Sequence, residues 1–289
     1  MSGMIKTILV QLTGDPGDES TLETAYLVAR LFDSHLECLH ISPDWRAAAA
    51  RAAVHGVSGP IVSGDFFASF EQETKATKWR ARRHLAEFCK KRQLSTSDSK
   101  PPSGRVSVTW REMPGEPWST MMREARFHDL VVLAHQDGID DLGSLILNAG
   151  RPVLIAPHRT PENLAPTIAV AWKETAESAR AISAAMPLLA KADRILVVSV
   201  EDGHGSAATM ESAERLARQL RWHGLNAEAD YVISGDDTVA SAIVKSARDN
   251  KADLIVSGGY GHSRLRELVL GGVTRDLLRE SPLPLFFFH

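Results

Sequence analysis

Residues 253–288 read DLIVSGGYGHSRLRELVLGGVTRDLLRESPLPLFFF, and this stretch decides the fold class. An apolar run, Leu254–Val256, leads into three closely spaced glycines, and a second apolar run, Leu285–Phe288, closes the segment. The residues that follow Gly272 are expected to open a helix between the two runs. Short apolar runs that flank a helix are typical of β-α-β units on a parallel sheet. The segment therefore predicts an α/β protein.

The same order of apolar runs occurs twice along the 289 residues. In the first half Lys6–Leu12 and His35–Ile41 flank a helical stretch, and in the second half Thr167–Trp172 and Arg194–Val200 do so. Each half continues to a final apolar strand, so two β-α-β-α-β-α-β-α-β units with right-handed crossovers fit the order. We predict two tandem doubly wound parallel sheets of five strands each, an α/β arrangement that resembles the Rossmann-like fold of nucleotide-binding alpha-hydrolase-like proteins.

A polar, proline-containing stretch, RTPENLAP at 159–166, separates the halves and predicts domains at 1–158 and 166–289. The first half is longer, because extra residues at about 43–104 lie between its second and third strands. Within them, 66–93 predicts a long, charged helix. This helix either covers one edge of the sheet in contact with solvent or offers a docking surface to a partner.

Composition limits the class of protein. The net charge of −3 provides no basic field for nucleic acid. Two cysteines, Cys38 and Cys89, are too few for a disulfide framework and fit a reducing compartment. Because no apolar run approaches the 20 or so residues of a membrane span, we expect a cytoplasmic protein without nucleic-acid or membrane partners.

Metal and catalytic patterns are weak. His35 would point to the opposite face of its strand from Cys38 and His40, so a metal site there is not expected. Glu267 and Asp276 could hold magnesium, but helix surface charges explain them better. No Ser-His-Asp or Cys-His arrangement follows from spacing, which argues against an enzyme.

The glycines after Leu254–Val256 carry the chemistry. Gly258, Gly259 and Gly261 allow the backbone to turn tightly with its N–H groups free to bind anionic oxygens. Gly271 and Gly272 then open the helix, and a helix N-terminus stabilises a phosphate. In an open α/β sheet, ligands bind at this edge, at the carboxyl ends of the strands.

The spacing G-x2-G-x9-G, followed by a small residue and Val-Thr, resembles the nucleotide loop of the universal stress protein family. The resemblance covers both halves of the chain, but the loop motif occurs only in the second. It implies an ATP site, with or without magnesium, in the second half. The implied binding residues are Gly258, Gly261, Gly271, Gly272, Val273 and Thr274, together with Ala171 and Val200.

Two departures from the family pattern weaken this implication. ATP-binding members carry Ser or Thr where this chain has Gly272, and an Asp that contacts adenosine where it has Lys173. Loss of a buried acceptor costs ~1–3 kcal/mol, although Lys173 could instead reach a phosphate. The glycine loop could also serve packing alone. In the first half, 134–150 lacks the glycine spacing and carries Asp137, Asp140 and Asp141, so no ATP is expected there.

Two functions follow from these observations. The first is a stress-response or signalling module that binds an adenine nucleotide in its second half without efficient turnover. A slow ATPase would be a third function and ranks last. The alternative is a ligand-free interaction or scaffold protein. The last strand, Leu285–Phe288, is expected to pair with Val153–Ala156. This pairing would give an internal pseudo-dimer. The alternatives are pairing across a homodimer and burial of the strand by the helices of its own domain.

Overall fold

The computed structural model describes residues 4–44, 64–96, 104–135, 139–201, 207–259 and 272–289. In the first half, strands and helices alternate in the predicted order. They are β1 (Thr7–Gln11), α1 (Asp18–Phe32), β2 (His35–Pro43), α3 (Gly64–Arg92), β3 (Ser107–Gly115), α4 (Pro117–Ala125), β4 (Leu130–Ala134), α5 (Ile139–Asn148) and β5 (Val153–Ala156).

The second half repeats this order. It consists of β6 (Thr167–Ala171), α6 (Ala176–Leu189), β7 (Arg194–Glu201), α7 (Ala207–Trp222), β8 (Ala227–Ile233), α8 (Val239–Asp249), β9 (Leu254–Gly258), α9 (Gly272–Glu280) and β10 (Leu285–Phe288). The strands coincide with the apolar runs of the sequence. Hydroxyl caps begin two helices: Thr175 accepts a hydrogen bond from the backbone N–H of Ser178, and Thr238 accepts one from Ser241.

The ten strands of the described residues form one sheet in the order β3-β2-β1-β4-β5-β10-β9-β6-β7-β8. Within each half all neighbouring strands are parallel, as predicted. The halves join where β10 runs antiparallel to β5, with Leu285 opposite Ile155 and Phe287 opposite Val153. The predicted pairing of these strands is confirmed, and the two expected five-stranded sheets are therefore continuous.

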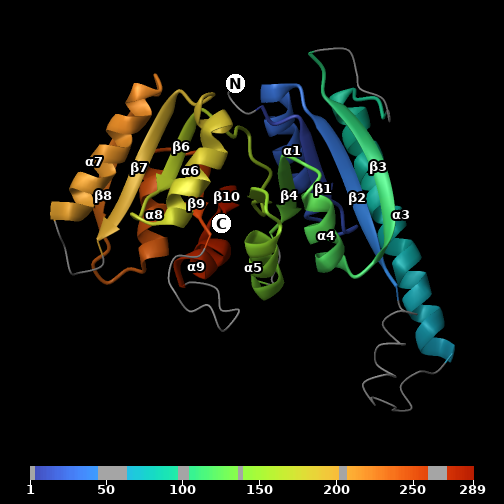
Figure 1. Cartoon of the computed structure of the whole chain (residues 1–289). Coiled ribbons are helices and arrows are strands. Elements are labelled where there is room, and N and C mark those ends of the chain that lie inside the picture. The colour runs from blue at the N-terminus through green and yellow to red at the C-terminus, as the bar shows by residue number, and fades with distance from the viewer. Residues whose placement is uncertain (1–3, 45–63, 97–103, 136–138, 202–206, 260–271) are drawn as a thin grey trace.

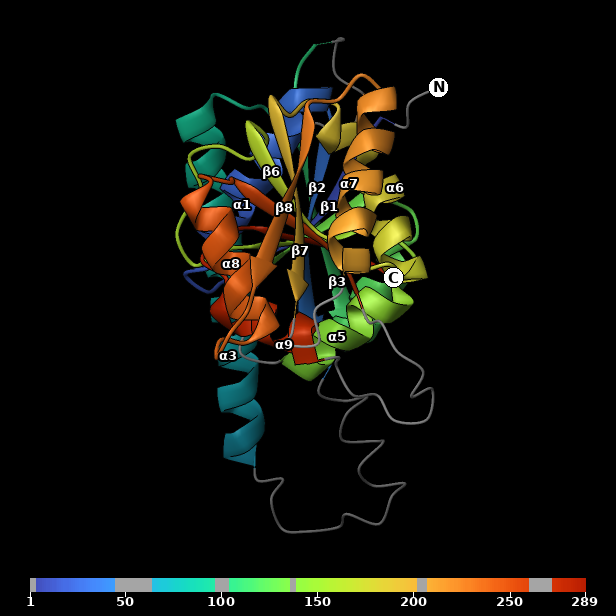
Figure 2. The ribbon, with the colours of Figure 1, turned by 90° about the vertical axis from the view of Figure 1, so that its left-hand side faces the viewer.

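Helices cover both faces of this sheet (Figures 1 and 2). Helices α1, α3, α6 and α7 pack on one face, and α4, α5, α8 and α9 pack on the other. Side chains of successive strand residues point to alternate faces of the sheet, so each face has its own apolar core. Each core extends through both halves, because the sheet is continuous. The pairing also buries the last strand, since Phe286 and Phe287 are both 0% exposed.

The predicted long helix is confirmed as α3, and its two ends differ. Toward its C-terminus Ala81, Leu85, Phe88 and Cys89 are buried against α1 and β2. Its N-terminal end extends beyond the sheet in Figure 1. Helix α3 is therefore part of the core along half its length, which corrects the expectation of a merely solvated cover.

The sequence offered weaker candidates for metal binding in His35, Cys38 and His40 and in the pair Glu267 and Asp276. Cys38 and His40 are buried, and Nδ1 of His40 lies 2.8 Å from the Leu12 carbonyl oxygen. Among the described residues, no group of three or more His, Cys, Asp or Glu side chains could hold a metal. Glu267 lies outside those residues. No helix in the described part of the chain is long and apolar enough to cross a membrane.

Candidate functional site

A pocket of about 570 Å³ opens at the carboxyl ends of β6, β7 and β9. The first turns of α6, α7, α8 and α9 contribute its other walls. This is the edge at which doubly wound α/β proteins bind ligands, and the volume is in the range of small-molecule sites.

The described residues predicted to bind a cofactor all lie on this pocket. Ala171 and Val200 come from the ends of β6 and β7, and Gly258 comes from the end of β9. The start of α9 contributes the remaining three, Gly272, Val273 and Thr274. Gly261 and Gly271 lie outside the described residues. The structure thus brings together six predicted residues from four segments far apart in sequence.

The two described glycines of the motif have different surroundings. A Cβ on Gly258 would lie 2.7 Å from the backbone nitrogen of Ser178, so the start of α6 requires glycine at this position. A Cβ on Gly272 would meet no atom of the described residues within 4 Å. Gly258 therefore permits close packing of α6 against the strand end, whereas Gly272 has no such contact with the described part of the chain.

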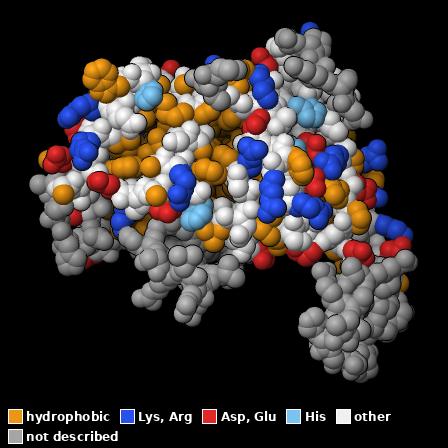
Figure 3. All heavy atoms as spheres, viewed as in Figure 1, with side chains coloured by type: hydrophobic (Ala, Val, Ile, Leu, Met, Phe, Trp, Pro, Cys, Tyr) orange, Lys and Arg blue, Asp and Glu red, His pale blue; other side chains and the backbone are white. Residues whose placement is uncertain are grey.

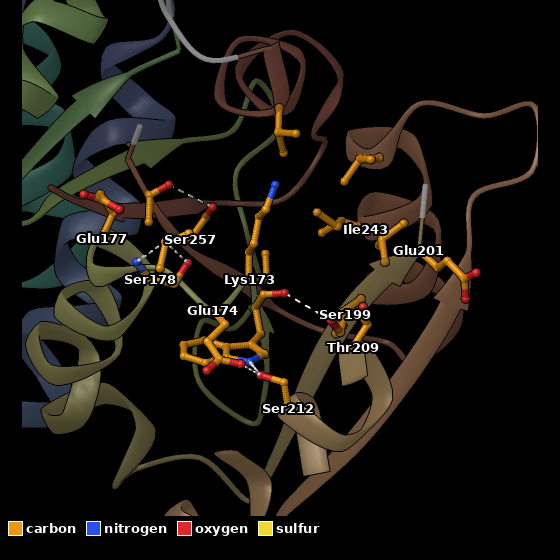
Figure 4. A pocket seen from close by; sticks show the side chains of 18 of the residues that line it. Lys173, Glu174, Glu177, Ser178, Ser199, Glu201, Thr209, Ser212, Ile243 and Ser257 are labelled. Atoms are coloured by element: carbon orange, nitrogen blue, oxygen red, sulfur yellow. Dashed lines mark hydrogen bonds between the residues drawn. The ribbon is translucent and has the colours of Figure 1, made fainter. Parts of the chain in front are cut away.

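A polar chain that the sequence analysis did not predict forms one wall (Figure 4). The indole Nε1 of Trp172 donates to Ser212 Oγ at 3.0 Å, and Ser212 donates to Glu174 Oε2 at 2.8 Å. Ser212 lies on α7, so only the tertiary fold brings it to the end of β6. Glu174 lies three residues after the end of β6 and could have been found by its place near a strand end.

Among the described residues that line the pocket, Lys173 alone has a lysine or arginine side chain. It lies in the loop after β6. Its side chain rises into the middle of the pocket, away from Ser212 and Glu174 (Figure 4). It makes no hydrogen bond or ion pair with the described residues. The pocket therefore holds a cation that is available to a ligand.

Glu177 lines the pocket at the start of α6. Its pKa is lowered, first by a hydrogen bond from its own backbone N–H and also by the Thr175 side chain and Arg180. The Arg180 guanidinium lies 3.0 Å from the carboxylate. Glu177 is therefore ionised at neutral pH and already has a cationic partner.

In the first half, the loop between β1 and α1 corresponds to the loop after β6, and it packs against α3. Asp18, 1% exposed, accepts hydrogen bonds of 2.9 Å from the backbone N–H groups of Thr13 and Gly14. Arg80 of α3 donates to the Gly14 carbonyl at 3.0 Å, and a Cβ on Gly14 would lie 2.3 Å from the Thr77 carbonyl oxygen. The loop amides thus bond to the protein's own carboxylate. Of the three predicted repelling aspartates, Asp141 is exposed on α5 and Asp137 lies outside the described residues.

Fold and pocket together define a class: a doubly wound α/β protein with a ligand-sized pocket at the carboxyl ends of its parallel strands. The family model of the universal stress protein family matches residues 165–289. The predicted resemblance is confirmed over residues 165–289, which match the model of this family, and the residues before them repeat the same fold.

Individual proteins are similar to this chain in sequence over a short stretch or in fold. A universal stress protein from Synechocystis is 32% identical over 82 residues, which cover 28% of this chain and 26% of that relative. A universal stress protein from Archaeoglobus fulgidus has the same fold over 99% of this chain and 96% of its own, with a TM-score of 0.66 at 16% identity. A functionally unknown protein from Pseudomonas aeruginosa aligns over 98% of this chain and 92% of its own, with a TM-score of 0.60 at 16% identity.

Proposed function

We propose that the second half binds an adenine nucleotide, ATP in particular, in the pocket at the ends of β6, β7 and β9. The single observation that carries this proposal is the 570 Å³ cavity bordered by Gly258 and by the start of α9, residues 272–274. The family resemblance implies the same residues for the phosphates and the ribose. Backbone N–H groups at a helix start suit phosphate oxygens, with or without bound magnesium.

The protein acts in this proposal as a cytoplasmic stress-response or signalling module. Its two domains, 1–158 and 166–289, form an internal pseudo-dimer through β5 and β10. Nucleotide binding changes the state of the molecule without efficient turnover, so release of phosphate from ATP stays at the background rate of a variant with a blocked pocket.

A blocked pocket tests the nucleotide proposal. Thr209 lines the pocket on α7, whereas the next residue, Met210, is 54% exposed and does not line it. In isothermal titration calorimetry, Thr209→Trp should weaken ATP binding at least about tenfold, and Met210→Trp should leave it unchanged. Binding by both variants with the affinity of the wild type would place the nucleotide elsewhere.

A ligand-free interaction or scaffold protein is the second candidate. It is favoured by Gly258, which packing against Ser178 alone explains, and by α3, whose N-terminal end extends past the sheet. Equilibrium dialysis distinguishes the two functions, because a scaffold protein of this kind would retain no ATP even at millimolar nucleotide.

A further inference from the structure

We infer that Lys173 binds an anionic group of the ligand, so that the pocket selects phosphorylated nucleotides over the bare nucleoside. The inference rests on the proposed function and specifies its ligand class. It depends on the charges that border the pocket and on which of them already have partners.

The described lining residues carry three carboxylates, Glu174, Glu177 and Glu201, and one ammonium, that of Lys173. Glu174 accepts the hydroxyl of Ser212, and Glu177 is paired with Arg180. Both carboxylates are thus engaged with the protein. Lys173 forms no hydrogen bond or ion pair through its side chain within the described part of the chain, although two of these carboxylates lie close to it in sequence.

The direction of the Lys173 side chain strengthens the contrast. Glu174 turns toward α7, where Ser212 holds it, whereas Lys173 extends into the hollow between Ser257 and Ile243 (Figure 4). Ile243 is apolar and Ser257 donates its hydroxyl to the Gly258 carbonyl at 3.2 Å. Neither neutralises an ammonium, so a ligand group that occupies this position gains most if it is an anion.

A phosphate oxygen is the natural partner, since a charge-assisted hydrogen bond between ammonium and phosphate is stronger than a neutral one. Adenosine lacks such a group. An ammonium at this position should therefore make ATP bind more tightly than adenosine. A carboxylate there would instead favour the hydroxyl and amino donors of the nucleoside.

The test is calorimetric titration of the full chain with ATP, adenosine and inorganic tripolyphosphate. The variant is Lys173→Met, and the matched control is Lys245→Met, which removes the same charge from an exposed position of α8 outside the pocket. Thermal melts of all three proteins check that each is folded. We expect Lys173→Met to weaken ATP binding at least about tenfold and to leave adenosine binding within about twofold. Lys245→Met should match the wild type for both.

The outcomes separate the two proposals. If Lys173→Met binds ATP like the wild type, or loses ATP and adenosine by the same factor, the role of Lys173 is wrong while nucleotide binding stands. If the wild type binds tripolyphosphate through Lys173, and binds ATP no more tightly than tripolyphosphate, the pocket does not recognise adenine. The adenine site is then wrong and the anion site stands. If the wild type binds none of the three ligands, both proposals are wrong.

Discussion

Gly272 stands where the universal stress protein pattern that this loop resembles has Ser or Thr, and the described residues leave room for a side chain there. A Cβ there meets no atom of the described residues within 4 Å. The missing hydroxyl is therefore not excluded by packing. At Gly258, by contrast, any side chain meets the backbone of α6.

Gly272→Ser should raise ATP affinity by several-fold, because a net hydrogen bond contributes roughly 0.5–1.5 kcal/mol. Gly272→Ala is the matched control, since it adds the Cβ without the hydroxyl and should not gain affinity. Calorimetric titration of both variants makes the comparison. Equal affinities for the Ser and Ala variants would mean that no phosphate or ribose oxygen lies near this residue.

A partly buried charged cluster joins β2, β3 and α4 in the first half. Arg111 forms ion pairs with Glu37 and with Glu124, the latter at 3.2 Å, and His128 Nε2 lies 3.6 Å from Glu37. Burial alone would lower the pKa of His128, but hydrogen bonds with Glu37 and the Glu124 backbone raise it above its usual 6.5. Burial would raise the pKa of Glu37, yet His128 and Arg111 lower it below 4.5.

His128 should make stability depend on pH. Its folded-state pKa is raised, so its contribution is complete below about pH 6.5 and is lost as the pH rises through the folded value. We expect the free energy of unfolding in urea to fall more between pH 6 and 8.5 for the wild type than for His128→Gln. Parallel pH curves for the two proteins would show that His128 is not protonated in this cluster.

At the scale of single elements, α3 carries two kinds of surface. Leu85 is 3% exposed in the core, whereas Trp79, less than two turns away, is 60% exposed beside Arg83. Because one of these side chains is buried and the other is exposed, we expect their substitution to have different effects on stability.

Leu85→Ala should destabilise the protein by about 2–5 kcal/mol, the usual cost of a buried leucine. Trp79→Ala should change stability by no more than about 0.5 kcal/mol, as is common for surface positions. Urea unfolding measures both. A small loss for Leu85→Ala would mean that α3 detaches from the sheet without unfolding the rest, and the first-half loop would then lose its cover.

Much of the fold could be predicted from the sequence, because apolar runs such as Leu254–Val256 mark buried parallel strands directly. The repeat fixed the order of elements, and the glycine pattern led to one side of the pocket. The contacts of Ser212 with Trp172 and of Arg80 with Gly14 could not be predicted, since each joins residues 40 or more positions apart. A helix surface gives no signal of which strand end it will meet.

At the scale of the whole molecule, the two halves meet along β5 and β10, and the contact reaches the pocket. A Cβ on Gly259, which follows β9, would lie 2.6 Å from Cγ2 of Ile146 in α5. His135 at the end of β4 also hydrogen-bonds to the Leu278 carbonyl of α9. The first half thus packs against the strand end and the helix that border the pocket. Figure 3 shows acidic and basic side chains interspersed over the described part of one face. The two strands that join the halves, β5 and β10, consist of apolar residues.

Residues 166–289 expressed alone should form dimers. Without β5, the backbone of β10 has an unpaired edge next to Phe286 and Phe287, and antiparallel pairing with a second β10 would restore the lost contacts. Sedimentation equilibrium at micromolar concentration would detect this. A stable monomer of this fragment would contradict the view that β5 is needed to satisfy that edge.

The central claim is that the chain holds one nucleotide site, open in the second half and closed by Asp18 and α3 in the first. Equilibrium dialysis of the full chain against saturating ATP measures the number of sites directly. The account predicts one ATP bound per chain, lost in Thr209→Trp. Two bound nucleotides would contradict the closed first half, and none would contradict the site itself.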